Sequence, residues 1–151
     1  MSKKLQQHAA LLRRLDGRNT DLGWFENARY KTGQSIAAVM MANEFGSAGS
    51  ETKAPTPARP LLRQTAAVLD AKVPGYIERR KAEILEGTLS VDDYLKKLGE
   101  AMVATAMQTL SAGNFAGNAE STIKQKGFDK PLVGVTGLLG QTINYRTVGN
   151  T

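Results

Sequence analysis

The chain of 151 residues is long enough for one domain, and its 20 Lys and Arg against 14 Asp and Glu give a net charge of +6. It has no cysteine, which excludes disulfides and thiolate metal sites. No apolar run approaches the roughly 20 residues that cross a bilayer. Polar residues also follow Lys3-Lys4-Leu5 at once, where an export signal would be apolar. We therefore expect a protein that is made and used without export and has no membrane partner.

The N-terminal third predicts a helix, a strand and a second helix. Residues 3–15 repeat leucines at helical spacing, which favours a short amphipathic helix. Residues 22–30 open with a compact apolar run between turn-forming residues, which favours a buried strand. Ser35 suits the N-cap of the next helix because its hydroxyl can accept a backbone N–H of the first turn. Gly46 stands where a helix-ending glycine is expected.

Residues 46–60 are rich in Pro, Gly and Ser and predict an exposed, partly extended loop. Pro60 then suits the first position of a long helix, where its missing N–H does no harm. Pro74-Gly75 interrupts the apolar spacing of that helix and is expected to kink or split it. Gly87 is expected to end it.

Ser90 and Asp93 have the spacing of a capping box, and the helix that follows is expected to run to about Ser111. Its apolar stripe makes it the clearest element of the sequence. The C-terminal part predicts four short elements: a helical turn at 121–126, an extended segment at 131–133, a turn at 136–139 and a strand at 142–148.

This order of elements predicts an α+β fold. Strands near both termini with helices between them favour a small sheet built from N- and C-terminal strands, packed with two long central helices. We expect residues 1–151 to form a single domain, with the loop at about 46–60 exposed. The terminal strand could be part of the core or could add to the sheet of a neighbour.

The sequence holds no pattern typical of an active site. His8 is the only histidine, so a triad or a multi-histidine metal site is hard to build. The glycines of 134–140 are spaced G-x-x-G-x-x-G, which matches neither the dinucleotide fingerprint nor the P-loop. Asp92 and Asp93 are adjacent and serve a helix start better than an acid–base pair. We expect no enzyme activity, no cofactor and no metal.

The basic surplus suits nucleic acid or an acidic protein surface, although an ordinary basic surface would look the same. No helix-turn-helix, zinc-finger or ribonucleoprotein pattern is present, so sequence-specific reading is not expected. The basic residues that could touch phosphates are Arg59, Arg63, Lys124, Lys126 and Lys130. A non-sequence-specific nucleic-acid-binding accessory protein therefore stays open as an alternative function.

Three stretches in a fixed order resemble a known family. They are residues 22–30 (LGWFENARY) leading into 35–46 (SIAAVMMANEFG); 56–63 (TPARPLLR); and 121–132 (STIKQKGFDKPL) running into 136–145 (TGLLGQTINY). Together they resemble the tail-completion and neck proteins, or virion morphogenesis proteins, of tailed bacteriophages and prophages. The resemblance covers about residues 20–148. Leu61 and Val135 depart from it, because the family often has an aromatic and an acidic residue there.

The resemblance implies a structural subunit of a ring that joins head and tail around the DNA channel. It implies a homo-oligomer, with six copies as the first expectation and twelve as the alternative, that contacts other neck, portal-adaptor or tail proteins and passing DNA. The expected location is the virion, after assembly in the host cytoplasm. On physical grounds Arg59 and Arg63 could clamp carboxylates of a neighbouring subunit, or Pro60 could simply start a helix beside solvated arginines. The expected assembly interface is Phe45, Gly46, Pro57, Arg59, Pro60, Leu61, Leu62 and Arg63; the expected DNA-channel or partner-facing residues are Lys124, Lys126 and Lys130.

Overall fold

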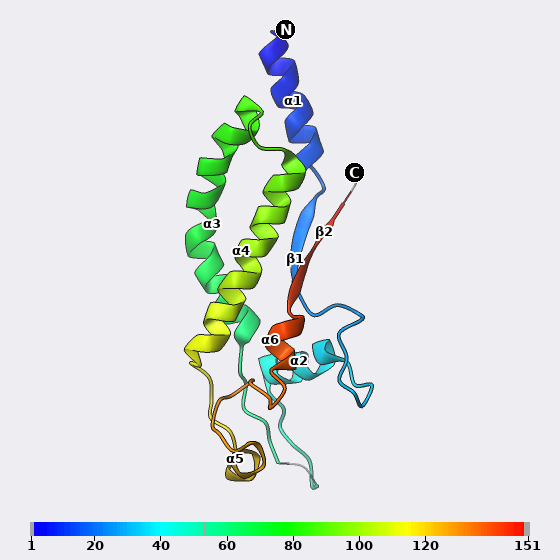
Figure 1. The fold of residues 1–151 in the computed structure, drawn as a ribbon, viewed down its shortest axis with the longest axis vertical. Coiled ribbons are helices and arrows are strands. Elements are labelled where there is room, and N and C mark those ends of the chain that lie inside the picture. Colours follow the sequence, from blue (N-terminus) through cyan, green and yellow to red (C-terminus); the bar gives the residue numbers. More distant parts are fainter. Residues whose placement is uncertain (1, 53, 150–151) are drawn as a thin grey trace.

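The computed structural model describes residues 2–52 and 54–149, and within them the chain forms six helices and two strands. Two long helices, α3 (Leu61–Glu86) and α4 (Val91–Ala112), form a hairpin along the length of the molecule (Figure 1). A two-stranded antiparallel sheet of β1 (Asn19–Gly23) and β2 (Asn144–Val148) packs against α4. The predicted α+β fold, with a sheet of N- and C-terminal strands beside two long helices, is confirmed.

The sheet depends on α4 for its cover. Leu22 lies opposite Tyr145 in the strand register, and a Cβ atom at Gly99 of α4 would overlap the Tyr145 ring. The ring therefore rests directly on the helix backbone at the one position without a side chain. A two-stranded sheet is marginal by itself in water, so this contact is what makes the pair of strands stable.

The N-terminal strand begins and ends earlier than the sequence suggested. The apolar run at 22–30 predicted a strand ending near Tyr30, whereas β1 ends at Gly23. Trp24 instead turns into the core, where its indole N–H donates a hydrogen bond of 2.9 Å to the carbonyl oxygen of Leu139. A buried aromatic donor that needs an acceptor takes the chain out of the strand at this point.

Local capping signals are confirmed at most helix ends. α1 spans Lys3–Leu15, and α2 spans Ile36–Phe45 with Ser35 as its N-cap. In α4 the hydroxyl of Ser90 accepts a hydrogen bond from the Asp93 N–H at 3.0 Å, as a capping box requires. Gly87 and Gly113 follow α3 and α4 in the left-handed conformation that favours glycine.

Of the two outcomes expected at Pro74, a kink or a split, the split does not occur. α3 runs without a break through Pro74, and Figure 1 shows the helix bowed away from α4 along its middle. A hollow of about 430 Å³ lies there, lined by Leu69, Val73 and Tyr76 of α3 and by Leu98 of α4 among others. Packing at the two ends of the hairpin keeps the helix continuous, and Pro74 bends it without breaking it.

Two apolar clusters hold the two ends of the hairpin. The first joins the start of α3 and the end of α4 to the rest of the chain, through Trp24, Ile36, Met40, Leu61, Ala106, Leu110, Leu139 and Ile143. The second lies at the turn between the long helices and contains Ile84, Leu89, Val91, Tyr94 and Leu95. Residues of α1 pack only against this second cluster, through Leu11 and Leu15.

The C-terminal part contains α5 (Glu120–Lys126) and α6 (Leu138–Thr142) before β2. The expected helical turn at 121–126, the turn at 136–139 and the terminal strand are therefore present, with the strand beginning at Asn144. The expected extended segment at 131–133 is wrong, because Leu132 has φ of +61° in a turn. Leu132 packs against the first cluster, and this burial holds a backbone conformation that few side chains adopt.

Candidate assembly interface

A buried carboxylate from α2 caps the first turn of α3. Glu44 is only 6% exposed, and its two carboxylate oxygens accept the backbone N–H groups of Leu62 and Arg63, both at 2.9 Å. The first N–H groups of a helix have no partner inside the helix, and Pro60, at the N-cap, makes no side-chain capping bond among the described residues. Glu44 therefore supplies from another helix the cap that α3 lacks.

Arg59 is part of the interior. It is 9% exposed, and its Nε and Nη2 atoms donate hydrogen bonds of 2.8 Å to the carbonyl oxygens of Ala116 and Gly117. Its Nη1 reaches Oδ1 of Asn43 at 3.3 Å, and burial lowers the pKa of the guanidinium below its ordinary value. The sequence suggested a clamp on a neighbour's carboxylate; the structure uses Arg59 to tie the loop after α4 to α2.

Arg63 lies at the surface beside the same carboxylate. Its Nε donates to Oε1 of Glu44 at 3.2 Å, and its Nη2 donates to the carbonyl oxygen of Glu44. The guanidinium also lies over the ring of Phe45, 5.2 Å from the ring centre. Because both residues are exposed, this stacked pair is the part of the predicted interface that a partner can reach.

The rest of the predicted interface divides between the surface and the interior. A Cβ atom at Gly46, where φ is +73°, would lie 2.7 Å from the Thr56 carbonyl oxygen, so only glycine fits beside the returning loop. Paired backbone bonds of 2.9 and 3.0 Å between Ser47 and Thr56 close the base of that loop. Pro57 is exposed, Pro60 and Leu62 are half-buried, and Leu61 is fully buried.

The three predicted lysines gather on and after α5. Lys124 and Lys130 are exposed, whereas Lys126 is half-buried and donates a hydrogen bond of 2.8 Å to the carbonyl oxygen of Lys130. Burial, and then the charge of Arg59, lower the pKa of Lys126. Figure 1 shows α5 and the loop between α2 and α3 at the end of the molecule opposite the N-terminus. The fold thus brings the predicted lysines and the Pro-rich loop to one end.

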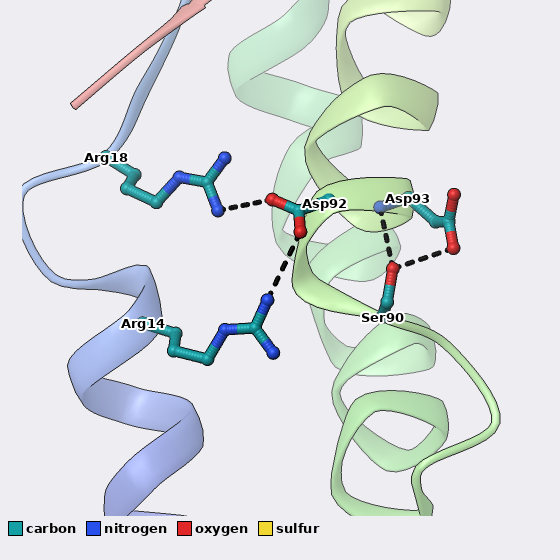
Figure 2. A network of polar contacts seen from close by, with 5 residues as sticks. All are labelled: Arg14, Arg18, Ser90, Asp92 and Asp93. Carbon is teal, nitrogen blue, oxygen red and sulfur yellow. Dashed lines mark hydrogen bonds and ion pairs between the residues drawn. The ribbon is translucent and has the colours of Figure 1, made fainter. Parts of the chain in front are cut away.

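A second polar joint fastens α1 to the start of α4 (Figure 2). The carboxylate of Asp92 accepts a hydrogen bond of 2.6 Å from Arg18 and one of 3.2 Å from Arg14. The hydrogen bond from Arg18 holds the pKa of Asp92 below its ordinary value of 3.8. In the same view the Ser90 hydroxyl accepts from the Asp93 N–H and donates to the Asp93 carboxylate, and these two bonds cap this end of α4.

Within residues 2–52 and 54–149, no group of three or more His, Cys, Asp or Glu side chains is placed to hold a metal ion. A hollow of about 530 Å³ beside α6 is lined mainly by apolar groups, including Met107, Leu110, Leu132 and Val133. The expectation that the chain has no enzyme activity and no cofactor stays a prediction.

The chain was compared with protein-family models, curated proteins and solved structures, and no match was found in any of the three. Among the helices that the structure describes, none combines the length and the apolar character needed to cross a membrane.

Sequence reasoning overlooked Glu44, and it assigned Asp92 to a helix start without a partner. An acidic residue in the last turn of α2 opposes the helix dipole, and this unfavourable placement was a signal that Glu44 has a partner elsewhere. Asp92 gave no such signal, because an acidic residue in the first turn of a helix is favourable without any partner.

Substituting Glu44 tests the joint between α2 and α3. Glu44→Ala leaves two backbone N–H groups of α3 without their acceptor, so we expect the free energy of unfolding to fall by about 1–3 kcal/mol. Urea unfolding followed by circular dichroism measures it. Glu100→Ala, at an exposed position of α4, is the matched control and should change stability by no more than about 0.5 kcal/mol. Equal effects of the two substitutions would contradict the capping role.

The stability of the attachment between α1 and α4 through Asp92 should depend on pH. A carboxyl pKa that is lower in the folded state stabilises the attachment above the ordinary value of 3.8, and this stabilisation is lost as the pH falls through the lowered pKa. NMR chemical shifts of the α1 amides, followed from about pH 7 to pH 2, should therefore change below 3.8. Asp92→Asn should abolish that step, whereas Asp70→Asn should leave it; a step that survives Asp92→Asn would contradict this role.

Proposed function

We propose that the protein is a structural subunit of the ring at the neck of a tailed bacteriophage, where it completes the tail and joins it to the head around the DNA channel. One observation carries the proposal beyond the resemblance itself. The first apolar cluster draws Trp24, Ile36 and Met40 from the first resembling stretch, Leu61 from the second and Leu139 from the third. Stretches that are far apart in sequence thus form one packed unit, as expected of motifs that define a fold.

The exposed features also suit a subunit that connects other proteins. Phe45 and Arg63 form an accessible stacked pair beside a stiff loop, which loses little entropy when it docks. Helix α1 stands at the opposite end of the molecule (Figure 1). A ring subunit of the neck needs one surface for neighbouring copies and another for other neck proteins, and the two ends of this elongated chain offer separate ones.

The ring is proposed to contain six copies, with twelve as the alternative, and to contact other neck, portal-adaptor or tail proteins in the virion. A heterologous interface that repeats from copy to copy closes into such a ring. Each subunit has a net charge of +6, so a ring of subunits would surround the channel with positive charge. Such a channel would attract the DNA backbone without recognising a base sequence.

The exposed Lys124 and Lys130 favour one alternative, a non-sequence-specific nucleic-acid-binding accessory protein. Such a protein would bind free DNA tightly, with an affinity that falls steeply as salt is added. A neck subunit needs no such affinity for free DNA, so a salt series of binding measurements separates the two functions.

Deleting the gene from the phage or prophage genome that carries it tests the proposal. We expect filled heads and completed tails to accumulate separately, because the piece that joins them is missing. Electron microscopy of the lysate measures the joined fraction, and the wild-type gene supplied in trans should restore it. Joined, infectious particles at the normal yield without the gene would contradict a neck function.

A further inference from the structure

Helix α1 is held to the rest of the chain only near its C-terminal end. None of its thirteen residues, all of which the structure describes, is buried. Leu11 and Leu15 pack against the second cluster, and Arg14 binds Asp92. Figure 1 shows the N-terminal part of α1 standing beyond the turn between α3 and α4. Residues 3–7 are all exposed, so the first turn of this helix has no cover from the described chain.

Two of the four basic residues of α1 oppose its own dipole. Residues 3–15 carry four Lys and Arg and no Asp or Glu, so +4 of the net +6 of the whole chain lies on this helix. Lys3 and Lys4 occupy the first turn, at the positive end of the helix dipole, where basic residues are unfavourable. Neither lysine has an ion-pair partner in the part of the chain that the structure describes. An acidic surface from outside the chain would relieve this repulsion.

Two leucines on α1 are also exposed. Leu5 is 55% and Leu12 is 64% exposed, and residues seven apart lie on the same face of a helix. Basic residues beside an exposed leucine face indicate a partner surface that is both acidic and apolar. Nucleic acid would satisfy the lysines and leave the leucines uncovered.

The C-terminal end of α3 offers a surface of that kind. The last turn of α3 contains Glu83 and Glu86 and no basic residue, although this is the negative end of its dipole. Glu83 and Glu86 give this turn a charge of −2, which matches the +2 of Lys3 and Lys4, and Glu83 also pairs with Arg80 one turn earlier. Ile77 and Leu85 of α3 are exposed large apolar residues close to these acids in sequence.

The two apolar faces do not cover one another within one chain. Figure 1 shows α1 beside the C-terminal end of α3 and the start of α4, yet Leu5, Leu12, Ile77 and Leu85 are all exposed. The leucine face of α1 is therefore free to cover this part of α3 in a neighbouring chain. A patch that fits a different patch on an identical copy gives a heterologous interface, which repeats from subunit to subunit.

We propose that α1 of one copy docks on the C-terminal half of α3 in the next copy. Leu5 and Leu12 cover Ile77 and Leu85, and the first turn of α1, with Lys3 and Lys4, lies against Glu83 and Glu86. The inference rests on the proposed ring, for which it names the contact that links one subunit to the next. It places that contact at the end of the molecule away from the Pro-rich loop.

Disulfide cross-linking between two differently marked copies tests this contact, since the natural chain has no cysteine. Full-length Leu5→Cys protein is mixed with full-length Leu85→Cys protein under mild oxidation, and Leu12→Cys is paired with Ile77→Cys in the same way. Bridged cysteines need Cβ atoms about 3.5–4.5 Å apart, so a mixed dimer reports close approach between copies. Val135→Cys, exposed and on a different part of the chain, replaces the α3 cysteine as the control. Mixed dimers no more abundant than with Val135→Cys would overturn the proposal.

Charge exchange between the two marked chains tests the electrostatic part. Lys3→Glu with Lys4→Glu in the α1-marked chain should reduce the cross-link several-fold, and Glu86→Lys in the α3-marked chain should also reduce it. Combining the two altered chains should restore it, because the attraction is then reversed in sign. Cross-linking that ignores all these changes would overturn the proposal. So would a lysine substitution that weakens binding to a DNA duplex while no cross-link forms between copies, because α1 would then serve nucleic acid.

The outcomes also separate this contact from the proposed function. A specific cross-link in a protein whose deletion leaves phage particles joined would support the contact and remove the neck function. An absent cross-link, together with unjoined heads and tails in the deletion lysate, would support the neck function and remove the proposed contact.

Discussion

The arrangement of the long helices depends on one buried carboxylate. Glu44 ends α2 and accepts the first free N–H groups of α3, so it fixes where α3 begins and how it leaves the first cluster. Arg63 balances the charge from the solvent side, while Arg59 ties the loop after α4 to the same place. Since α4 follows α3 in the hairpin and carries the sheet, an error at this joint would displace most of the molecule. A carboxylate left there without its partners would be costly to bury.

The sequence predicted the parts of the fold that local chemistry decides. Ser35 and Ser90 cap helices through contacts three residues away, and Gly87 supplies a backbone conformation that glycine favours, so none of them depends on distant groups. The end of the strand before Trp24 and the continuity of α3 through Pro74 depend on surroundings that come from elsewhere in the chain. The acceptor for Trp24 is 115 residues away, and packing at both ends of the hairpin holds α3 together across its proline.

In the candidate interface, too, the sequence predicted what local chemistry decides and missed what depends on distant groups. Gly46 was recognised as a helix end, although its closeness to Thr56, which makes glycine necessary, follows from the path of the loop. Arg59 looked available because arginine is usually exposed, and no local pattern shows that the carbonyl groups of Ala116 and Gly117 surround it. The exposed leucines of α1 were part of a correctly predicted amphipathic helix. That they lack cover could only be learned from the placement of α1 at the edge of the molecule.

The mass of the purified protein in solution, measured by light scattering over a concentration series, tests the central claim most directly. A ring subunit should approach a discrete assembly of six or twelve times the chain mass of 16.3 kDa, with no continuous growth beyond it. A mass that stays at one chain at every concentration, together with failure to assemble when portal and tail proteins are added, would contradict the account.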